Sequence, residues 1–216
     1  MNEQTQSLEA IQDIRRLMNR SSRFLSLSGL SGIAAGGWAL AGAWLAGRRI
    51  GSYYDDYERN GYSLAEFVRL KQHLLLMAAA VLALAMASAF FFTWRRARQQ
   101  GLPMWDRTAR QLSINMLIPL VSGGLLLLAL LRYEDANLLG LIGPLCLIFY
   151  GLSLVNASKY TVNDIRYLGV LEIILGLINT QFLGYGLFFW AIGFGLLHIV
   201  YGFIMWWKNE RTDTKG

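Results

Sequence analysis

Cysteine, histidine and charged residues are scarce in this chain, and each scarcity excludes a class of function. Cys146 is the single cysteine among 216 residues, so the sequence predicts no intramolecular disulfide and no cysteine-based zinc site. Two histidines without a metal-ligand spacing predict no bound metal, and no phosphate loop or haem motif predicts another cofactor. Only 16% of residues are charged, and no nucleic-acid motif is present, so the net charge of +6 does not indicate nucleic-acid binding.

Apolar residues are abundant instead. They make up 55% of the chain, which is too much for a soluble domain of this length. Six windows approach the roughly 20 apolar residues with which a helix crosses about 30 Å of hydrocarbon. We place these spans at 24–46, 73–94, 112–131, 137–157, 167–182 and 186–207. The sequence therefore predicts an all-α integral membrane bundle of six transmembrane helices, whose fifth span is the shortest and most polar.

Basic residues predict the orientation of the bundle, because Lys and Arg accumulate in short cytoplasmic segments. With both termini cytoplasmic, cytoplasmic segments hold 14 of the 20 basic residues: four before the first span, five between the second and third, two between the fourth and fifth, and three at the end. In the external loop 48–71, Ser63 and Glu66 have the spacing of a capping box, which predicts a helix start near Leu64. The predicted domains are a cytoplasmic helix at 1–23, the six-helix domain at 24–207 and a cytoplasmic tail at 208–216.

The segment 1–23 has the periodicity of an amphipathic helix. Its apolar residues recur every three or four positions, at Leu8, Ile11, Ile14, Leu17 and Met18. Such a helix could lie on the inner leaflet with its arginines near anionic headgroups, or bind a cytosolic protein partner. It could equally pack beneath its own bundle, and the sequence leaves these three alternatives open.

Small residues form stripes on several spans. Ser28, Gly32 and Gly36 lie at i, i+4 and i+8 on the first span, where they would let another helix approach closely. That helix could belong to the same bundle or to a second copy in a homo-oligomer. The fifth and sixth spans carry the stripes Gly169, Glu172, Gly176, Asn179 and Ala191, Gly195, His198, Gly202.

Glu172 and His198 interrupt these apolar spans. Each lies 13 residues from Tyr185, at the turn of the predicted hairpin, so an antiparallel pair of helices places both at one depth. An ionised carboxylate alone at that depth costs several kcal/mol, and pairing with an imidazole removes much of the cost. We therefore expect a hydrogen bond between Glu172 and His198.

Other polar residues belong to the same half of the predicted bundle. They are Asn115 on the third span and Tyr150 and Asn156 on the fourth, and Asn179, on the stripe of the fifth span, completes the candidate polar site. A cavity open to the cytosol would gather them around the pair, and a carboxylate with a histidine could then exchange protons as in a proton-linked carrier. The alternative is a buried polar clamp that joins two helices.

The whole chain, particularly "LEAIQDIRRLMNRSSRFLSLSGLSGIAAG", resembles small polytopic bacterial inner-membrane proteins of uncharacterised families. That resemblance implies six helices and a bacterial plasma membrane, and it carries over no functional residue. No arrangement of nucleophile and base predicts an enzyme. The sequence thus predicts a membrane-embedded sensing, regulatory or scaffolding component, with a small proton-linked transporter as the alternative.

Overall fold

The computed structural model describes residues 28–101, 105–133, 136–162 and 164–209, and within these ranges every regular element is helical. The long helices are α2 (Gly29–Asn60), α3 (Leu64–Gln99), α4 (Arg107–Leu130), α6 (Ile142–Ala157), α7 (Asp164–Asn179) and α9 (His198–Asn209). Shorter elements are α5 (Ala136–Gly140), η1 (Ser158–Tyr160), η2 (Leu183–Tyr185), α8 (Gly186–Trp190) and the π-helical segment η3 (Ala191–Leu197). The predicted helix 1–23 and most of the predicted tail lie outside the described residues.

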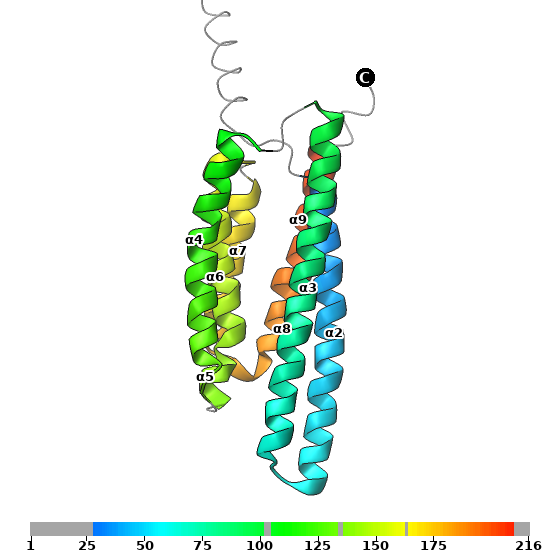
Figure 1. The fold of residues 1–216 in the computed structure, drawn as a ribbon, viewed down its shortest axis with the longest axis vertical. Helices are drawn as coiled ribbons and strands as arrows, with labels where there is room; N and C mark the ends of the chain where they lie inside the picture. Colours follow the sequence, from blue (N-terminus) through cyan, green and yellow to red (C-terminus); the bar gives the residue numbers. More distant parts are fainter. Residues whose placement is uncertain (1–27, 102–104, 134–135, 163, 210–216) are drawn as a thin grey trace, which may run out of the picture.

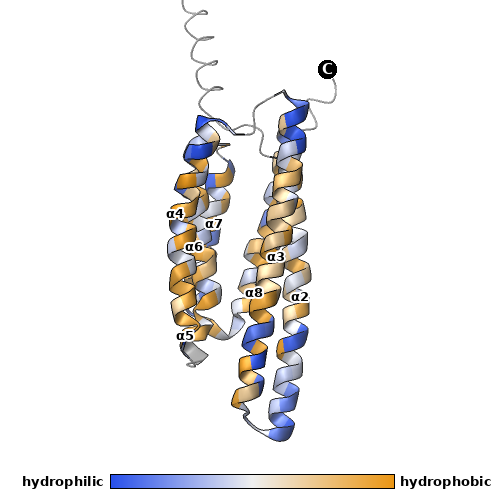
Figure 2. Cartoon of the chain, in the orientation of Figure 1, coloured by the Kyte–Doolittle hydropathy of each residue, from blue (hydrophilic) through white to orange (hydrophobic). Residues whose placement is uncertain are grey.

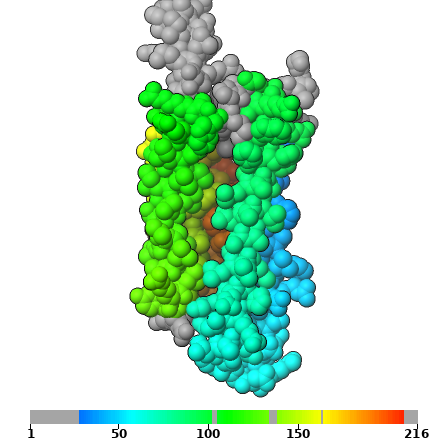
Figure 3. All heavy atoms as spheres, in the orientation of Figure 1, coloured from blue at the N-terminus to red at the C-terminus, as the bar shows by residue number. Residues whose placement is uncertain are grey.

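The helices form two groups that lie side by side (Figure 1 and Figure 3). In one group α2 packs against α3, η3 and α9, and in the other α6 packs against α4 and α7. The groups meet where α6 and α7 contact the chain from α8 to α9. We call this contact the central seam. Polar side chains from the two helix groups can meet each other only at this contact.

Five helical stretches are long and apolar enough to cross a membrane among the described residues. They correspond to the first, second, third, fourth and sixth predicted spans. The remaining helix, α7, has 16 residues and is about 24 Å long. It runs beside α6 over the same height of the bundle (Figure 1), and its sequence is the short fifth span of the prediction.

The chain ends of the described bundle lie together. The start of α2 contacts the end of α9, since a Cβ on Gly29 would overlap backbone atoms of Trp206. We call this the terminal end, and the opposite end the hairpin end. The hairpin end is dominated by α2 and α3, which continue beyond the other helices (Figure 1).

The predicted loop 48–71 is mostly helical, and its first half corrects the prediction, because the first helix does not end near residue 46. α2 runs on to Asn60, and α3 begins at Leu64, as the capping box predicted. The Glu66 backbone N–H donates to Ser63 Oγ over 3.5 Å. Consequently α2 and α3 are about 48 and 54 Å long, well beyond the roughly 30 Å of a hydrocarbon core.

Apolar side chains cover the outside of the bundle. Figure 2 shows hydrophobic colour along the middle of the helices and hydrophilic colour at the terminal end and on the α2–α3 hairpin. Large exposed side chains on α3 and α4 include Leu76, Leu82, Met86, Phe90, Ile118, Leu125 and Leu128. A soluble protein rarely leaves so continuous an apolar surface, whereas lipid-facing helices require one.

The small-residue stripe on α2 packs against α9 inside the bundle. A Cβ on Gly32 would lie 3.1 Å from the Gly202 Cα atom, and one on Gly36 would lie 2.6 Å from the Gly195 carbonyl oxygen. Ser28, at the head of the stripe, is buried. The α2 stripe is therefore occupied by a helix of the same chain.

Glycines also allow α6 and α7 to approach closely. A Cβ on Gly151 would lie 2.5 Å from the Gly169 carbonyl oxygen, and one on Gly176 would lie 2.8 Å from the Pro144 carbonyl oxygen. Thus the small residues of α7 face α6, and Gly195 and Gly202 face α2. The glycines of the two stripes therefore do not face each other, which corrects the expectation from the sequence. They dock each helix onto a neighbour in its own group.

Candidate functional site at the central seam

Glu172 and His198 meet at the central seam. Glu172, on α7, is 0% exposed, and His198, at the start of α9, is 7% exposed. The Glu172 Oε1 atom lies 3.5 Å from His198 Nδ1. The two residues therefore share one depth in the bundle, at ion-pair distance.

The prediction of a hydrogen bond between Glu172 and His198 is wrong. Neither oxygen of Glu172 has a hydrogen-bond partner. Instead, His198 Nδ1 lies 3.0 Å from the Gly193 carbonyl oxygen, and His198 Nε2 lies 2.7 Å from the hydroxyl of Tyr150. Both ring nitrogens are thus engaged by other groups, and Glu172 faces the histidine without bonding to it.

These contacts define the direction of each hydrogen bond. A carbonyl oxygen can only accept, so His198 Nδ1 carries a proton and donates it to Gly193. With a neutral ring, the Tyr150 hydroxyl then donates to the lone pair on Nε2. The result is a chain from Tyr150 on α6, through His198 on α9, to the backbone of η3.

The π-helical segment η3 makes this chain geometrically available. Its seven residues, Ala191–Leu197, precede His198 directly, and a π-helix shifts carbonyl groups out of the ordinary i→i−4 pattern. The His198 side chain reaches back five residues to the Gly193 carbonyl. Gly193 was not among the residues predicted from the sequence, because a π-helix leaves no clear signal in apolar periodicity.

Gly193 also makes room for the carboxyl group. A Cβ at this position would lie 2.5 Å from Glu172 Oε2 and would overlap the Leu147 side chain. Leu147, on α6, is itself 0% exposed. The carboxyl group is therefore enclosed by α6, η3 and α9, and only a residue without a side chain fits at position 193.

Aromatic rings close the site on one side. The Tyr150 ring centroid lies 5.0 Å from that of Phe194 and 5.3 Å from the His198 ring. Phe194 stacks on His198 at 6.0 Å. A small core of Leu154, Ile165, Leu168 and Met205 continues the seam toward the terminal end. Beyond it, Lys208 Nζ lies 3.6 Å from Asp164 Oδ1.

The other predicted polar residues do not join this cluster. Asn179 is 0% exposed, lies near Gly143 two turns along α7, and has no hydrogen-bond partner for its side-chain amide. The Asn156 amide donates to the Asn115 carbonyl oxygen over 2.9 Å, which ties α6 to α4. The six residues predicted to surround one cavity therefore form three separate groups, of which only Tyr150, His198 and Glu172 make one site.

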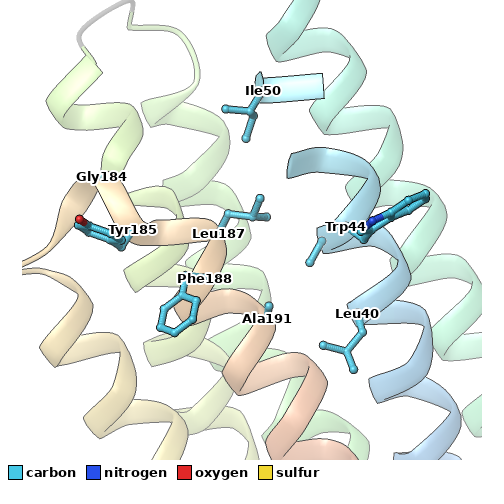
Figure 4. A pocket seen from close by; sticks show the side chains of 9 residues that line it. Leu40, Trp44, Ile50, Gly184, Tyr185, Leu187, Phe188 and Ala191 are labelled. Carbon is cyan, nitrogen blue, oxygen red and sulfur yellow. The ribbon is translucent and has the colours of Figure 1, made fainter. Parts of the chain in front are cut away.

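An open pocket lies elsewhere, at the hairpin end between α2 and the η2–α8 region (Figure 4). It measures about 500 Å³ and has apolar walls. None of the cluster residues lines it. In the part of the chain that the structure describes, no three His, Cys, Asp or Glu side chains gather as a metal site requires.

No protein-family model matches the chain, and neither a curated protein nor a solved structure does.

Proposed function

We propose that this chain is a multi-pass membrane protein with a sensing, regulatory or scaffolding role and no catalytic activity. In this proposal the Tyr150–His198–Glu172 cluster is a polar clamp that holds the two helix groups together. The observation that carries it is burial: Glu172 is 0% exposed and His198 is 7% exposed, so the surroundings scarcely reach these side chains. A carrier site has to be reached by its cargo, whereas a clamp is strongest when dry.

The proposed topology has six spans and both termini in the cytoplasm of a bacterial cell, in the inner membrane. The distribution of basic residues supports this orientation, and the pairing of α7 with α6 along its length supports α7 as the fifth of the six spans. A helix of 16 residues is short for a span, but protein covers much of its polar surface, including Glu172 and Asn179. A cytosolic protein that binds the segment 1–23 is the proposed partner.

Cysteine accessibility tests the topology, since Cys146 is the only native cysteine. In a Cys146→Ala background, Lys159→Cys and Gln181→Cys place one thiol at each end of α7, and both positions are exposed. A membrane-impermeant maleimide added outside the cell should label Gln181→Cys and leave Lys159→Cys unlabelled. Equal labelling at the two positions would exclude α7 as a span.

A second function, proton-linked transport, is favoured by one specific observation. Both carboxyl oxygens of Glu172 lack a hydrogen-bond partner although they are buried. A carboxyl group left unpaired in this way is costly and often belongs to a moving part. It lies at the seam between two helix groups, where a rocking motion would open it to one side.

Access to Glu172 separates the two functions without knowledge of a substrate. Dicyclohexylcarbodiimide is an apolar reagent that modifies carboxyl groups within membranes, and mass spectrometry of the peptide would locate the adduct. The clamp predicts no modification of Glu172 in native vesicles. Rapid modification of Glu172 in the native protein would favour the carrier.

A proton-flux measurement also distinguishes the clamp from the carrier. Proteoliposomes that contain a pH-sensitive dye should lose an imposed pH gradient no faster than protein-free vesicles if the cluster is a clamp. Flux that Glu172→Gln abolishes would favour the carrier. His73→Gln serves as the matched control, because His73 is exposed and bonds only within its own helix, to the Arg69 carbonyl oxygen.

A further inference from the structure

The open pocket at the hairpin end has apolar walls drawn from two parts of the chain. Its lining residues are Leu40, Ala43, Trp44 and Ile50 from α2, and Gly184, Tyr185, Leu187, Phe188 and Ala191 from η2, α8 and η3. Figure 4 shows these side chains on the two sides of the pocket. A volume of about 500 Å³ lies within the range of pockets that hold small ligands.

One arginine lies beside a wall of this pocket. Arg48 follows the lining residue Trp44 by one helical turn, Arg49 comes next on a different face of α2, and both side chains are exposed. The Arg48 guanidinium lies 5.2 Å from the centroid of the Trp44 ring, which holds the cation against the pocket wall. The ion pairs seen among the described residues, at Glu172 and Asp164, leave both arginines available to an external anion.

The aromatic residues around the rim indicate the depth of the pocket in a bilayer. Trp44 is 62% exposed and Tyr185 is 65% exposed, although both line the pocket. Trp and Tyr with one apolar side and one polar atom concentrate at the level of lipid headgroups. The rim therefore lies at that level, and the pocket extends from it toward the hydrocarbon.

The charge at this rim runs against the general pattern of the chain. Under the proposed topology most basic residues are cytoplasmic, and Arg48 and Arg49 are external. Orientation alone thus gives no reason for a pair of arginines here. A negatively charged group bound beside an apolar pocket does give one.

We propose that this pocket binds an anionic phospholipid of the outer leaflet, with an acyl chain between α2 and α8 and the phosphate on Arg48. This inference rests on the membrane insertion proposed above, and it is independent of the role of Glu172. Arg48 stacked on Trp44 is preorganised for a phosphate oxygen, and Arg49 adds a second positive charge. A neutral zwitterionic lipid would gain less from the pair.

Fluorescence quenching at Trp44 tests the proposal. Full-length protein is placed in phosphatidylcholine vesicles that contain increasing amounts of either phosphatidylglycerol or phosphatidylcholine with brominated acyl chains. The signal of Trp44 is the difference between the native protein and Trp44→Phe. We expect brominated phosphatidylglycerol to reach half-maximal quenching at a mole fraction at least fivefold lower than brominated phosphatidylcholine does.

Variants of the two arginines test whether these side chains cause the preference for phosphatidylglycerol over phosphatidylcholine. One arginine near an anionic lipid contributes about a fivefold preference, so Arg48→Gln with Arg49→Gln should bring the ratio close to one. Arg95→Gln with Arg98→Gln is the matched control, because Arg98 lies 5.6 Å over Trp94 at the opposite end of the bundle. That control should keep the preference at Trp44. Ala191→Phe, which fills the pocket, should reduce quenching by both lipids.

Each failure has its own signature. Equal quenching by the two lipids, or a preference that survives loss of both arginines, overturns the lipid site while membrane insertion stands. Quenching that is absent for every tryptophan overturns the membrane insertion itself. If both brominated lipids quench Trp44 at low protein-to-lipid ratio and neither does at high ratio, a second copy of the chain covers the pocket. That result also overturns the proposal.

Discussion

The two seams that join α9 to the rest of the molecule are built in different ways. Against α2, the seam is made of glycines, and a Cβ at Gly29 or Gly36 would overlap backbone atoms of the facing helix. Against α6 and α7, the seam contains Tyr150, His198 and Glu172 in polar contact. One seam is held by close backbone packing and the other by side chains that carry protons.

This difference determines which of the two helix contacts can rearrange. Backbone atoms in contact leave no alternative arrangement of similar energy, so the glycine seam makes α2 and α9 one unit. A polar seam has discrete alternatives, because a hydroxyl group and an imidazole can exchange partners. If the two helix groups move relative to each other, the motion must occur at the polar seam.

Gly36→Ile should have the largest effect. The added side chain meets the Gly195 carbonyl oxygen and the Ile199 side chain, and the backbone cannot retreat without separating α2 from η3. We expect a loss of about 3 kcal/mol in unfolding free energy. Gly37→Ile is the neighbouring control, because a Cβ there meets nothing within 4 Å. Unfolding of both variants by SDS in detergent measures the difference, and equal effects would mean that helix propensity dominates.

Gly193→Ala should be the next in size. The new methyl group would lie 2.5 Å from Glu172 Oε2, so either the carboxyl group or the π-helical segment must shift. We expect a loss of about 1–2 kcal/mol. In a Glu172→Ala background the same change should cost clearly less, since the carboxyl group is gone. Additive effects in the double variant would show that the two residues do not share the space.

Tyr150→Phe and His198→Gln, made separately and together, measure the polar seam directly. We expect a coupling of about 1 kcal/mol, because the structure joins these side chains by a 2.7 Å hydrogen bond inside the bundle. The pair Glu172→Gln and His198→Gln should couple more weakly, since 3.5 Å and no hydrogen bond separate them. If Glu172 and His198 couple more strongly than Tyr150 and His198, the hydrogen bond between Glu172 and His198 that the sequence predicted is supported instead.

Asp164→Asn should have the smallest effect. Its ion pair with Lys208 closes the terminal end of the central seam, but the two side chains are 28% and 58% exposed. Exposed pairs of this kind contribute little, so we expect a change of about 0.5 kcal/mol that disappears at high salt. A loss above about 2 kcal/mol would show that the seam depends on this surface contact.

Much of the architecture was predictable from local patterns. Runs of apolar residues predicted the all-helical fold and the positions of five long apolar helices, because hydrophobicity is a local property of the sequence. The capping residues Ser63 and Glu66 predicted the start of α3. Equal spacing from Tyr185 predicted that Glu172 and His198 share a depth, since an antiparallel hairpin converts residue number into height.

Partner choice was not predictable in the same way. A stripe of glycines predicts a close helix contact but does not say which helix lies on the other side. In the structure the glycines of α7 pack against α6, and Gly195 and Gly202 pack against α2. The fourth predicted span contains a break between α5 and α6, near Pro144, and η3 departs from the ordinary helical register. These local changes of geometry direct His198 toward Tyr150 and Gly193.

Local sequence patterns were enough to tell which segments are helical, which of them are apolar enough to span a membrane, and at what height Glu172 and His198 lie. These properties depend on residues close together in the chain. Only the tertiary structure decided that His198 bonds to Tyr150, that Glu172 stays unpaired behind Gly193, and that Arg48 stands at the rim of a pocket. Those outcomes depend on rotation about helix axes and on which helices adjoin, which the packing of the whole bundle sets.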